Sequence, residues 1–595
     1  MVARPVLILL AVAAALRPAS LAADVEPVWP LDLDTRFLTS NFMERRPGRY
    51  HAGLDFKTDS RTGFAVRAVE DGYVSRVRAE AGAYGRAIYV QGVSGRTTVY
   101  AHLERFSDRI AALVEADRAR SGVYRVRLEP GPDALPVRAG DVLGLSGQSG
   151  TGGPHLHFEV RDAAQRPLNP LDWGFAVADT FLPVIAAVTA HAVVPVAGLP
   201  VAAAVRDEAG LRGTLPVLEV RGPVAFSARI TDRADVRGHV LEPWLLEVFL
   251  DGRPVYRRCN ERFAFADNNQ LRLEWCHVAD QEGATVLREH WLFRREGVDV
   301  PGREGGPWHL GPGGGLDPGE HELRLVASDR AGGRAEVTVP LRVLPVGDGA
   351  PLAGWPEVAA HLEDGAGARL TPFAAERPGP QVRVRTLAPP ADPVLAPATL
   401  WTLPWDAAAD TTARPAPGLE GPYWGAIHLA ADWPVDAAPE VAADGAPAEP
   451  GLWVFRWSGG RWRAGGPLLV DGAGPPRYRL GSPGRHAVFR DRTAPWIDPR
   501  PLEVAAREPS AVPGVTLPRW TTVPVEVVDR GTGVDDATIR ATLGGAPLIV
   551  EPDLIRHRVL VTVPDGTAPG RHELRLEAAD EAGNRAVRTL IVQVR

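Results

Sequence analysis

Residues 147–161 read GQSGTGGPHLHFEVR, and this stretch decides how the first quarter of the chain is built. After Pro154, polar and apolar residues alternate, which is the pattern of a β-strand with one buried face. The polar face carries His155, His157 and Glu159. The apolar face carries Leu156, Phe158 and Val160. We therefore predict a strand that buries its apolar side and presents two imidazoles to a common target.

The glycine run before this strand lacks the Lys-Ser/Thr pair of a phosphate-binding loop. Glycine carries no side chain and adopts backbone conformations that other residues avoid. We therefore expect the run to form a flexible wall along which an extended substrate backbone can pass.

The whole chain has the composition of a multidomain, mainly β protein. At 595 residues it is too long for one core, and its length predicts about four domains. It contains 62 glycines and 56 prolines, and long helical periods are scarce, which favours many short strands. The net charge of −7 and the dispersed basic residues argue against a nucleic-acid partner.

Residues 1–23 have the pattern of a signal peptide. Arg4 precedes an apolar run over residues 6–16, and small residues near Ala22 offer a cleavage position. The run is too short to cross a bilayer, and no later segment is long and apolar enough. We predict an exported protein, periplasmic or extracellular, with no membrane span in the mature chain.

Residues 24–178 are predicted to form an antiparallel β-sheet domain with one short helix. Alternating runs such as RAIYVQGV and LPVRAGDVLGLSG are bounded by Gly, Pro or Asp. The exception is residues 106–120, where Ile110, Leu113 and Val114 recur at helical spacing.

The rest of the chain contains a repeat. GEHELRLVASDRAGGRAEVTV from Gly319 matches GRHELRLEAADEAGNRAVRTL from Gly570, and further matching segments precede each copy. We predict two β-sandwich modules, residues 179–345 and 491–595, which resemble bacterial immunoglobulin-like domains. The first carries an insertion over residues 259–312. The Asp-x-Ala-Gly turns at Asp329 and Asp580 are compatible with calcium, but a structural turn is the favoured interpretation.

Residues 346–490 form a tryptophan-rich segment between the two copies. It holds eight of the 16 tryptophans, from Trp355 to Trp462. Exposed tryptophans would indicate a glycan-binding module, whereas buried ones indicate a further β domain, which we favour.

Only two cysteines occur, Cys259 and Cys276. In an oxidising compartment they would form a disulfide that closes a small loop, which is the favoured interpretation. Free thiols are the main alternative. A second zinc site with His277 and His290 matches no common spacing.

Two further segments of the first domain carry histidine. In YHAGLDFK, residues 50–57, a strand reading places His51, Gly53 and Asp55 on one face, with Gly53 leaving room between the other two. In VYAHLERF, Tyr100 and His102 share a predicted face, opposite Val99, Ala101 and Leu103. Each segment alone is weak evidence, because packed or surface polar residues would explain it and AHLED recurs from Ala360.

Together the three segments indicate metal chemistry. Two histidines and one carboxylate are a common ligand set for catalytic zinc, which activates a water molecule and polarises a carbonyl. The remaining histidines can move protons or stabilise an oxyanion. The chain shows no Ser-His-Asp elbow, HExxH helix or dinucleotide loop that would compete.

HxGxD, YxHL and GPHLHFEVR occur in this order over about residues 35–175, and the arrangement resembles the lysostaphin/LytM-type zinc endopeptidases of bacterial peptidoglycan. The resemblance implies a Zn²⁺ cofactor held by His51, Asp55 and His157. It implies catalytic roles for His102 and His155, which are not ligands, and a peptide stem or cross-bridge as substrate.

The chain departs from the family pattern at Met43, which follows Phe42 where the family often has glycine, and in the longer segment after His102. We expect a local packing change and a differently shaped substrate groove. Two alternatives remain: a non-catalytic regulator that activates wall amidases, and a glycan-binding envelope scaffold. A protein partner in the envelope is compatible with each.

Overall fold

A computed structural model of the chain describes most of its residues. They are residues 26–46, 48–192, 202–221, 224–234, 239–274, 289–294, 298–305, 316–345, 368–371, 383–386, 399–405, 419–430, 440–443, 451–458, 461–469, 477–479, 484–500, 502–504, 521–564 and 567–594. The predicted signal peptide, Cys276 and His277 lie outside them. No helix among these residues has the length and hydropathy to span a membrane.

The first unit is built on an antiparallel nine-stranded sheet in which β13 (His155–Arg161) lies between two neighbouring strands. The strand order is β1 (Leu38–Ser40), β4 (Leu54–Lys57), β13, β8 (Thr97–Ala101), β7 (Arg86–Gly92), β6 (Gly72–Ala79) and β10 (Val126–Leu128). The edge strands β11 (Pro136–Val137) and β14 (Pro167–Leu168) pair with β6 and β13. Two smaller sheets comprise β5 (Ala65–Arg67), β12 (Val142–Leu145) and β9 (Arg105–Phe106), and β2 (Arg45–Arg46) and β3 (Arg49–Tyr50).

The alternation of β13 sets the two sides of this sheet. Leu156, Phe158 and Val160 are at most 1% exposed and belong to the main core. Phe158 packs against aromatic rings from three other segments, Phe56, Tyr100 and Phe175. The opposite side of the strand carries His155, His157 and Glu159. One apolar face is therefore buried, as the sequence pattern predicts.

The predicted helix is present as α1 (Asp108–Ser121). Ile110 and Val114 are buried beneath it, whereas Leu113 is 39% exposed and faces outward. The helix ends at Gly122, whose left-handed φ of 72° lets its N–H donate to Arg118 O.

The predicted faces of the YxHL segment are wrong. His102 lies just beyond β8 with a φ of 60°, in the left-handed region, so the strand alternation stops before it. Leu103 therefore joins Tyr100 in the main core, while Val99 and Ala101 pack on the other side of the sheet with Tyr89.

The two repeated segments each form two sheets around one core. In the first, the sheets contain β15 (Val184–Ala192), β16 (Ala202–Arg206), β19 (Val224–Thr231) and β22 (Glu289–Trp291), and β17 (Gly213–Thr214), β18 (Leu218–Arg221), β20 (Leu245–Leu250), β21 (Arg253–Cys259), β23 (Arg303–Gly305), β24 (Gly319–Ser328) and β25 (Arg334–Leu344). In the second, they contain β35 (Trp496–Ile497), β37 (Thr521–Val528), β40 (Val550–Asp553) and β41 (Arg558–Val563), and β36 (Leu502–Val504), β38 (Val534–Leu543), β39 (Ala546–Leu548), β42 (Gly570–Asp580) and β43 (Arg585–Val594).

The predicted insertion of the first repeat contributes to the core of the first unit. Phe263, Leu271, Val298 and Val300 are buried in the same cluster as Phe42 and Tyr50. Two 3₁₀ segments, η1 (Pro170–Trp173) and η2 (Phe265–Glu274), accompany this contact. The insertion therefore packs into the core of the first unit, while the two sheets of the first repeat enclose a core of their own.

Between the repeats lie β26 (Ala368–Thr371), β27 (Arg383–Thr386), β28 (Thr399–Trp405), β29 (Leu419–Ala430), β30 (Glu440–Ala443), β31 (Leu452–Ser458), β32 (Arg461–Pro467), β33 (Arg477–Arg479) and β34 (Gly484–Asp491). Trp462 is 3% exposed and packs against Phe489, and Trp453 is half-buried. The side chains of the other six tryptophans in residues 346–490 are outside the description.

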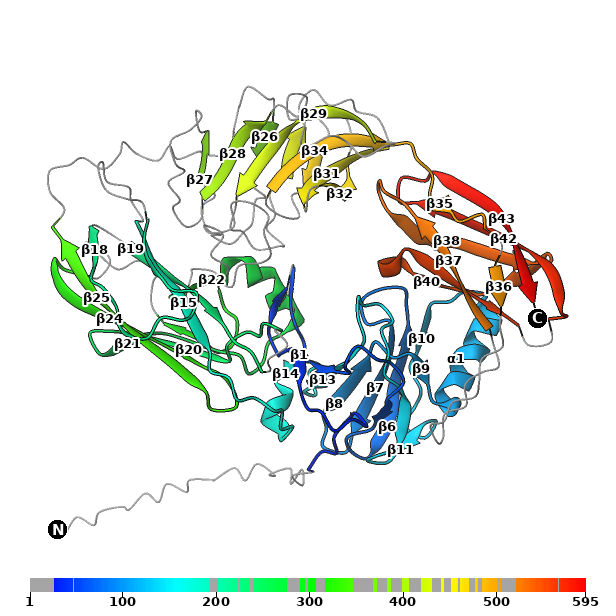
Figure 1. The fold of residues 1–595 in the computed structure, drawn as a ribbon, viewed down its shortest axis with the longest axis horizontal. Coiled ribbons are helices and arrows are strands. Elements are labelled where there is room, and N and C mark those ends of the chain that lie inside the picture. Colours follow the sequence, from blue (N-terminus) through cyan, green and yellow to red (C-terminus); the bar gives the residue numbers. More distant parts are fainter. Residues whose placement is uncertain are drawn as a thin grey trace, which may run out of the picture.

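The units follow one another around a ring, so that the last repeat returns to the first unit beside α1 and β10 (Figure 1). Glu551 pairs with Arg86 across this contact, and Arg556 reaches the glycine-rich loop before β13. The short helix η6 (Leu554–Arg556) carries that arginine.

Cys259 is a free, buried thiol whose Sγ lies 3.2 Å from Glu261 Oε1. The favoured disulfide involves Cys276, which lies outside the described residues, so it stays a prediction. Burial raises the pKa of Cys259 to about 12, and the neighbouring Glu261 carboxylate adds to the effect.

Candidate metal centre

Three side chains from two neighbouring strands and the segment before one of them meet at the polar side of the first sheet. His157 on β13 lies opposite Asp55 on β4 in the strand register, and His51 lies in the short segment between β3 and β4. His157 Nδ1 is 2.8 Å from Asp55 Oδ1 and 2.9 Å from His51 Nε2. His51 Nε2 is 3.0 Å from Asp55 Oδ1. All three residues are buried.

The outer hydrogen bonds determine which nitrogens face the centre. His51 Nδ1 lies 2.8 Å from Asn41 O, which can only accept, so Nδ1 carries the proton. His157 Nε2 lies 2.8 Å from the Glu159 carboxylate, so it also donates. In the neutral imidazoles, both nitrogens that face Asp55 Oδ1 therefore present lone pairs.

This arrangement fits a zinc ion. Three lone pairs directed at one another repel unless a cation lies between them. Zinc bonds of 2.0–2.1 Å imply ligand atoms about 3.3 Å apart in a tetrahedron, close to the spacing of these three atoms. Each imidazole also donates its outer N–H to a carbonyl or carboxylate, as metal-bound histidines usually do.

Charged neighbours hold the two carboxylates ionised. Arg46 donates to Asp55 Oδ2 at 2.6 Å. Burial would raise the pKa of Asp55, but His51 and His155 outweigh it and hold that pKa well below its usual range. Glu159 is buried, and Arg161 overcomes the effect of its burial to lower its pKa to about 2. Tyr84 Oη also donates to Glu159, at 2.6 Å.

The histidine pKa values differ because their partners differ. Burial would lower the pKa of His157, but Asp55 and Glu159 raise it to about 8, so Nδ1 would give up its proton when a cation binds there. Burial lowers the pKa of His51 to about 4, and burial together with the neighbouring histidines lowers that of His102. The pKa of His155 is also lowered, mainly by burial.

His102 and His155 face each other at the rim of the centre. Their ring centroids are 4.8 Å apart, and His155 Nε2 lies 3.6 Å from Asp55 Oδ1. His102 Nδ1 donates to Ser149 O at 2.8 Å, and His155 Nδ1 donates to Gly153 O at 2.9 Å. Both rings are therefore neutral bases whose Nε2 atoms carry the lone pair.

The glycines of this region have different roles. A side chain at Gly53 would lie 2.1 Å from Phe158 O, so this glycine admits the backbone of β13 rather than a ligand, contrary to the expectation. Gly150 has a φ of 68° and packs against Gly85. Gly152 and Gly153 have open space where a side chain would project, as a substrate wall requires.

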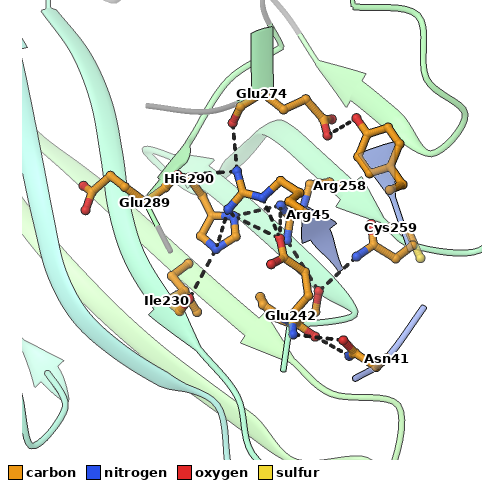
Figure 2. Close-up of polar contacts among 12 residues, drawn as sticks. Asn41, Arg45, Ile230, Glu242, Arg258, Cys259, Glu274, Glu289 and His290 are labelled. Carbon is orange, nitrogen blue, oxygen red and sulfur yellow. Dashed lines mark hydrogen bonds and ion pairs between the residues drawn. The ribbon is translucent and has the colours of Figure 1, made fainter. Parts of the chain in front are cut away.

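The first repeat supports the segment that leads to His51 (Figure 2). Asn41 Nδ2 donates to Glu242 O at 2.6 Å, and Glu242 N donates to Asn41 Oδ1 at 3.0 Å. The buried Arg45 pairs with Glu242 and lies 2.8 Å from His290 Nδ1. His290 thus belongs to this buried network.

Met43 marks the departure from the family pattern. It is 1% exposed and has a φ of 57°, a conformation that favours glycine. The expected packing change is therefore a buried methionine at a left-handed position.

Sequence reasoning named the five central residues but missed their supports. Arg46, Tyr84 and Asn41 carried no motif that distinguishes them from ordinary surface residues. Arg161 could have been noticed, because it ends the HLHFEVR strand on the same face as Glu159.

Comparisons with known proteins find similarity to peptidases over part of the chain. Residues 49–119 match the family model described as Peptidase family M23. The chain is 33% identical over 124 residues to "DD-carboxypeptidase/endopeptidase Mpg" of Neisseria meningitidis, a match that covers 21% of this chain and 22% of that protein. It is 32% identical, over 21% of each chain, to an "Uncharacterized metalloprotease" of Haemophilus influenzae.

Among solved structures, a zinc-containing peptidase from Vibrio cholerae aligns with a TM-score of 0.19 and 28% identity, covering 25% of this chain and 39% of that one. The curated relatives thus match over about a fifth of their length. The first β-sheet unit of this chain, with its clustered histidines, is a Peptidase M23 domain of the LytM type.

Proposed function

We propose that this protein is an exported, zinc-dependent endopeptidase that hydrolyses peptide bonds in the stems or cross-bridges of bacterial peptidoglycan. The observation that carries the proposal is the convergence of His51, Asp55 and His157, with two neutral histidines beside them. The M23 match and the relatives named as peptidases support the reaction class.

In this proposal His51, Asp55 and His157 hold zinc, which would polarise the scissile carbonyl and acidify a water molecule. His102 or His155 accepts a proton from the attacking water at Nε2. The resulting imidazolium then donates that proton to the nitrogen of the leaving amine. The hydrogen bonds to Ser149 O and Gly153 O keep both rings in the tautomer that this step requires.

The hydrogen bonds to the two histidine ligands, His157 and His51, position their rings. Glu159 fixes the ring of His157, and Asn41 O fixes the ring of His51. Arg46 offsets the negative charge of Asp55 at the oxygen that does not face the histidines. Gly152 and Gly153 leave space for an extended peptide beside His155.

We also propose that the two repeats are immunoglobulin-like modules, residues 179–345 and 491–595, which position the peptidase domain of residues 24–178. Their paired sheets and separate cores support this assignment. A partner protein in the envelope is compatible with the arrangement.

The test is digestion of purified peptidoglycan by the purified protein, with zinc content measured in parallel and products identified by mass spectrometry. We expect about one zinc per chain and new peptide termini that disappear in His155→Ala. His321→Ala is the matched control, because His321 is a half-buried histidine of the first repeat that pairs with Asp251.

Zinc binding without cleavage would contradict the enzymatic function and favour the regulator, which an assay with added amidases would then test. A folded protein that binds no zinc would show that the ligand assignment is wrong.

A further inference from the structure

Three aspartates meet where the first repeat begins. Asp179 lies in the connection from the peptidase domain to β15, Asp232 follows β19, and Asp329 follows β24. One carboxylate oxygen from each lies within 4.8 Å of the others. Asp232 and Asp329 are 3% and 4% exposed.

This triad lines a cavity that contains unsatisfied polar atoms. The cavity has a volume of about 480 Å³ and lies between the first repeat and the segment that holds Asn41. Asp329 Oδ2 is buried without a hydrogen-bond partner, and so is the side-chain oxygen of Asn260, which lines the same cavity. Buried carboxylate and amide oxygens without partners are costly, and a bound cation would satisfy them.

The second repeat contains an equivalent triad of Asp491, Asp529 and Asp580. Asp179 opens the segment DTFLPVI and Asp491 opens DRTAPWI, each leading into the first strand of its module. Asp529 follows β37 as Asp232 follows β19, and Asp580 ends β42 as Asp329 follows β24. Asp529 Oδ1 is likewise buried without a partner.

Among the described residues, neither triad forms an ion pair with a basic side chain; Arg330, which lines the first cavity, pairs with Asp172 instead. The hydrogen bonds to Asp329 and Asp529 come from backbone N–H groups of their own turns. Burial and the like charges of Asp179 and Asp329 raise the pKa of Asp232 to about 8. Burial and Asp491 together raise the pKa of Asp529 to about 6.

We propose that each triad is a Ca²⁺ site. The bound ion would connect the segment that leads into the module to two loops of that module. Oxygen-only ligands favour a hard cation over zinc, which prefers nitrogen and sulfur. Mg²⁺ retains its waters and usually takes only one or two carboxylates, whereas Ca²⁺ accepts six to eight oxygens in flexible geometry. Backbone carbonyls and water complete the coordination. The proposal is independent of the peptidase activity.

The first experiment is calcium titration of the purified protein by isothermal calorimetry after treatment with EGTA. We expect two Ca²⁺ per chain with half-saturation at or below about 1 mM. Asp232→Asn and Asp529→Asn each retain one site, and the double variant retains none. Asp207→Asn, an exposed aspartate of the first repeat, retains both. His157→Ala also retains both, which separates these sites from the zinc centre.

Terbium provides a second measurement that locates the first site. Trp244 lines the cavity and should sensitise Tb³⁺ luminescence there. We expect added Ca²⁺ to displace Tb³⁺ and reduce the luminescence. Asp232→Asn should abolish the part of the luminescence that depends on Trp244, and Asp529→Asn should leave that part intact. A folded wild-type protein that binds no calcium, or calcium binding unchanged in both variants, would overturn the proposal.

Discussion

Asn41 and Glu242 exchange two hydrogen bonds between the peptidase domain and the first repeat, and the carbonyl of the same asparagine orients His51. The contact joins residues 201 positions apart. A zinc ligand of the proposed centre is thus oriented by a segment that depends on a second domain.

Asn41→Ala should therefore weaken zinc binding although Asn41 is not a ligand. Loss of both side-chain hydrogen bonds frees the segment whose carbonyl fixes His51. We therefore expect the affinity for zinc to fall about tenfold, the lower end of the range for residues that hold a metal ligand in place. Competition with a chromogenic chelator measures this. Gln165→Ala, on the same domain away from the centre, should leave the affinity unchanged; an unchanged Asn41→Ala would show that the repeat does not support the site.

Glu159→Gln should reduce zinc affinity by about 10–100-fold. The glutamine amide has no negative charge to accept the hydrogen bond from His157 Nε2 or to pair with Arg161. Both of these partner side chains are buried. The same competition assay measures the loss, with Glu129→Gln, an exposed carboxylate, as control. Equal zinc affinities in the two variants would show that Glu159 does not position His157.

Arg556→Ala should loosen the glycine-rich loop. Arg556 donates to Gln148 Oε1 at 2.6 Å and to Thr151 O at 3.0 Å, on either side of the carbonyl that orients His102. Hydrogen bonds from a charged group imply about 10–100-fold more frequent opening when they are lost. Hydrogen exchange at residues 148–153 measures this, and Arg571→Ala on the same repeat is the control. Unaltered exchange would mean that the last repeat merely touches the loop.

The acidic triads should make stability depend on pH when calcium is removed. The pKa of Asp232 is about 8 in the folded protein against 3.8 in the unfolded chain, so folding favours its protonated form. The contribution of Asp232 to the free energy of unfolding is complete below pH 3.8 and is lost as the pH rises toward 8. Asp232→Asn mimics the protonated form and does not titrate. In EGTA, its Tm relative to wild type should therefore increase from pH 5 to pH 8.

Saturating calcium should reverse that order at pH 8, because only the wild type gains binding energy at the first site. A Tm difference that stays constant with pH in EGTA would contradict the assigned burial of the triad.

Local pattern was sufficient for the parts of the site that lie on regular strands. The alternation of β13 predicts both the buried face of Phe158 and the shared face of His155 and His157, because strand geometry fixes them. It fails at His102, where a single left-handed residue separates the imidazole from Tyr100 and turns Leu103 into the main core. Gly53 was likewise misread, since its need for space comes from the carbonyl of Phe158 on a distant strand.

The residues that support the site could not be predicted from the sequence for a different reason. Glu242 and Arg556 act across contacts between units, whereas the aspartates of each triad meet through the folding of one module. No spacing in the sequence encodes either kind of contact. The two matching Asp-x-Ala-Gly turns were visible, but Asp179 and Asp232 became their partners only in three dimensions. A repeated motif therefore identified the turns without revealing the clusters.

The bond between Arg556 and Gln148 spans 408 residues, and this separation has a consequence for biosynthesis. At about 5–20 residues per second, a ribosome completes Arg556 roughly 20–80 s after Gln148. The nascent peptidase domain spends that interval without the arginine that restrains the wall beside its histidines. The finished geometry of the site therefore depends on completion of the last module, and a chain that stalls before residue 556 carries an unrestrained wall.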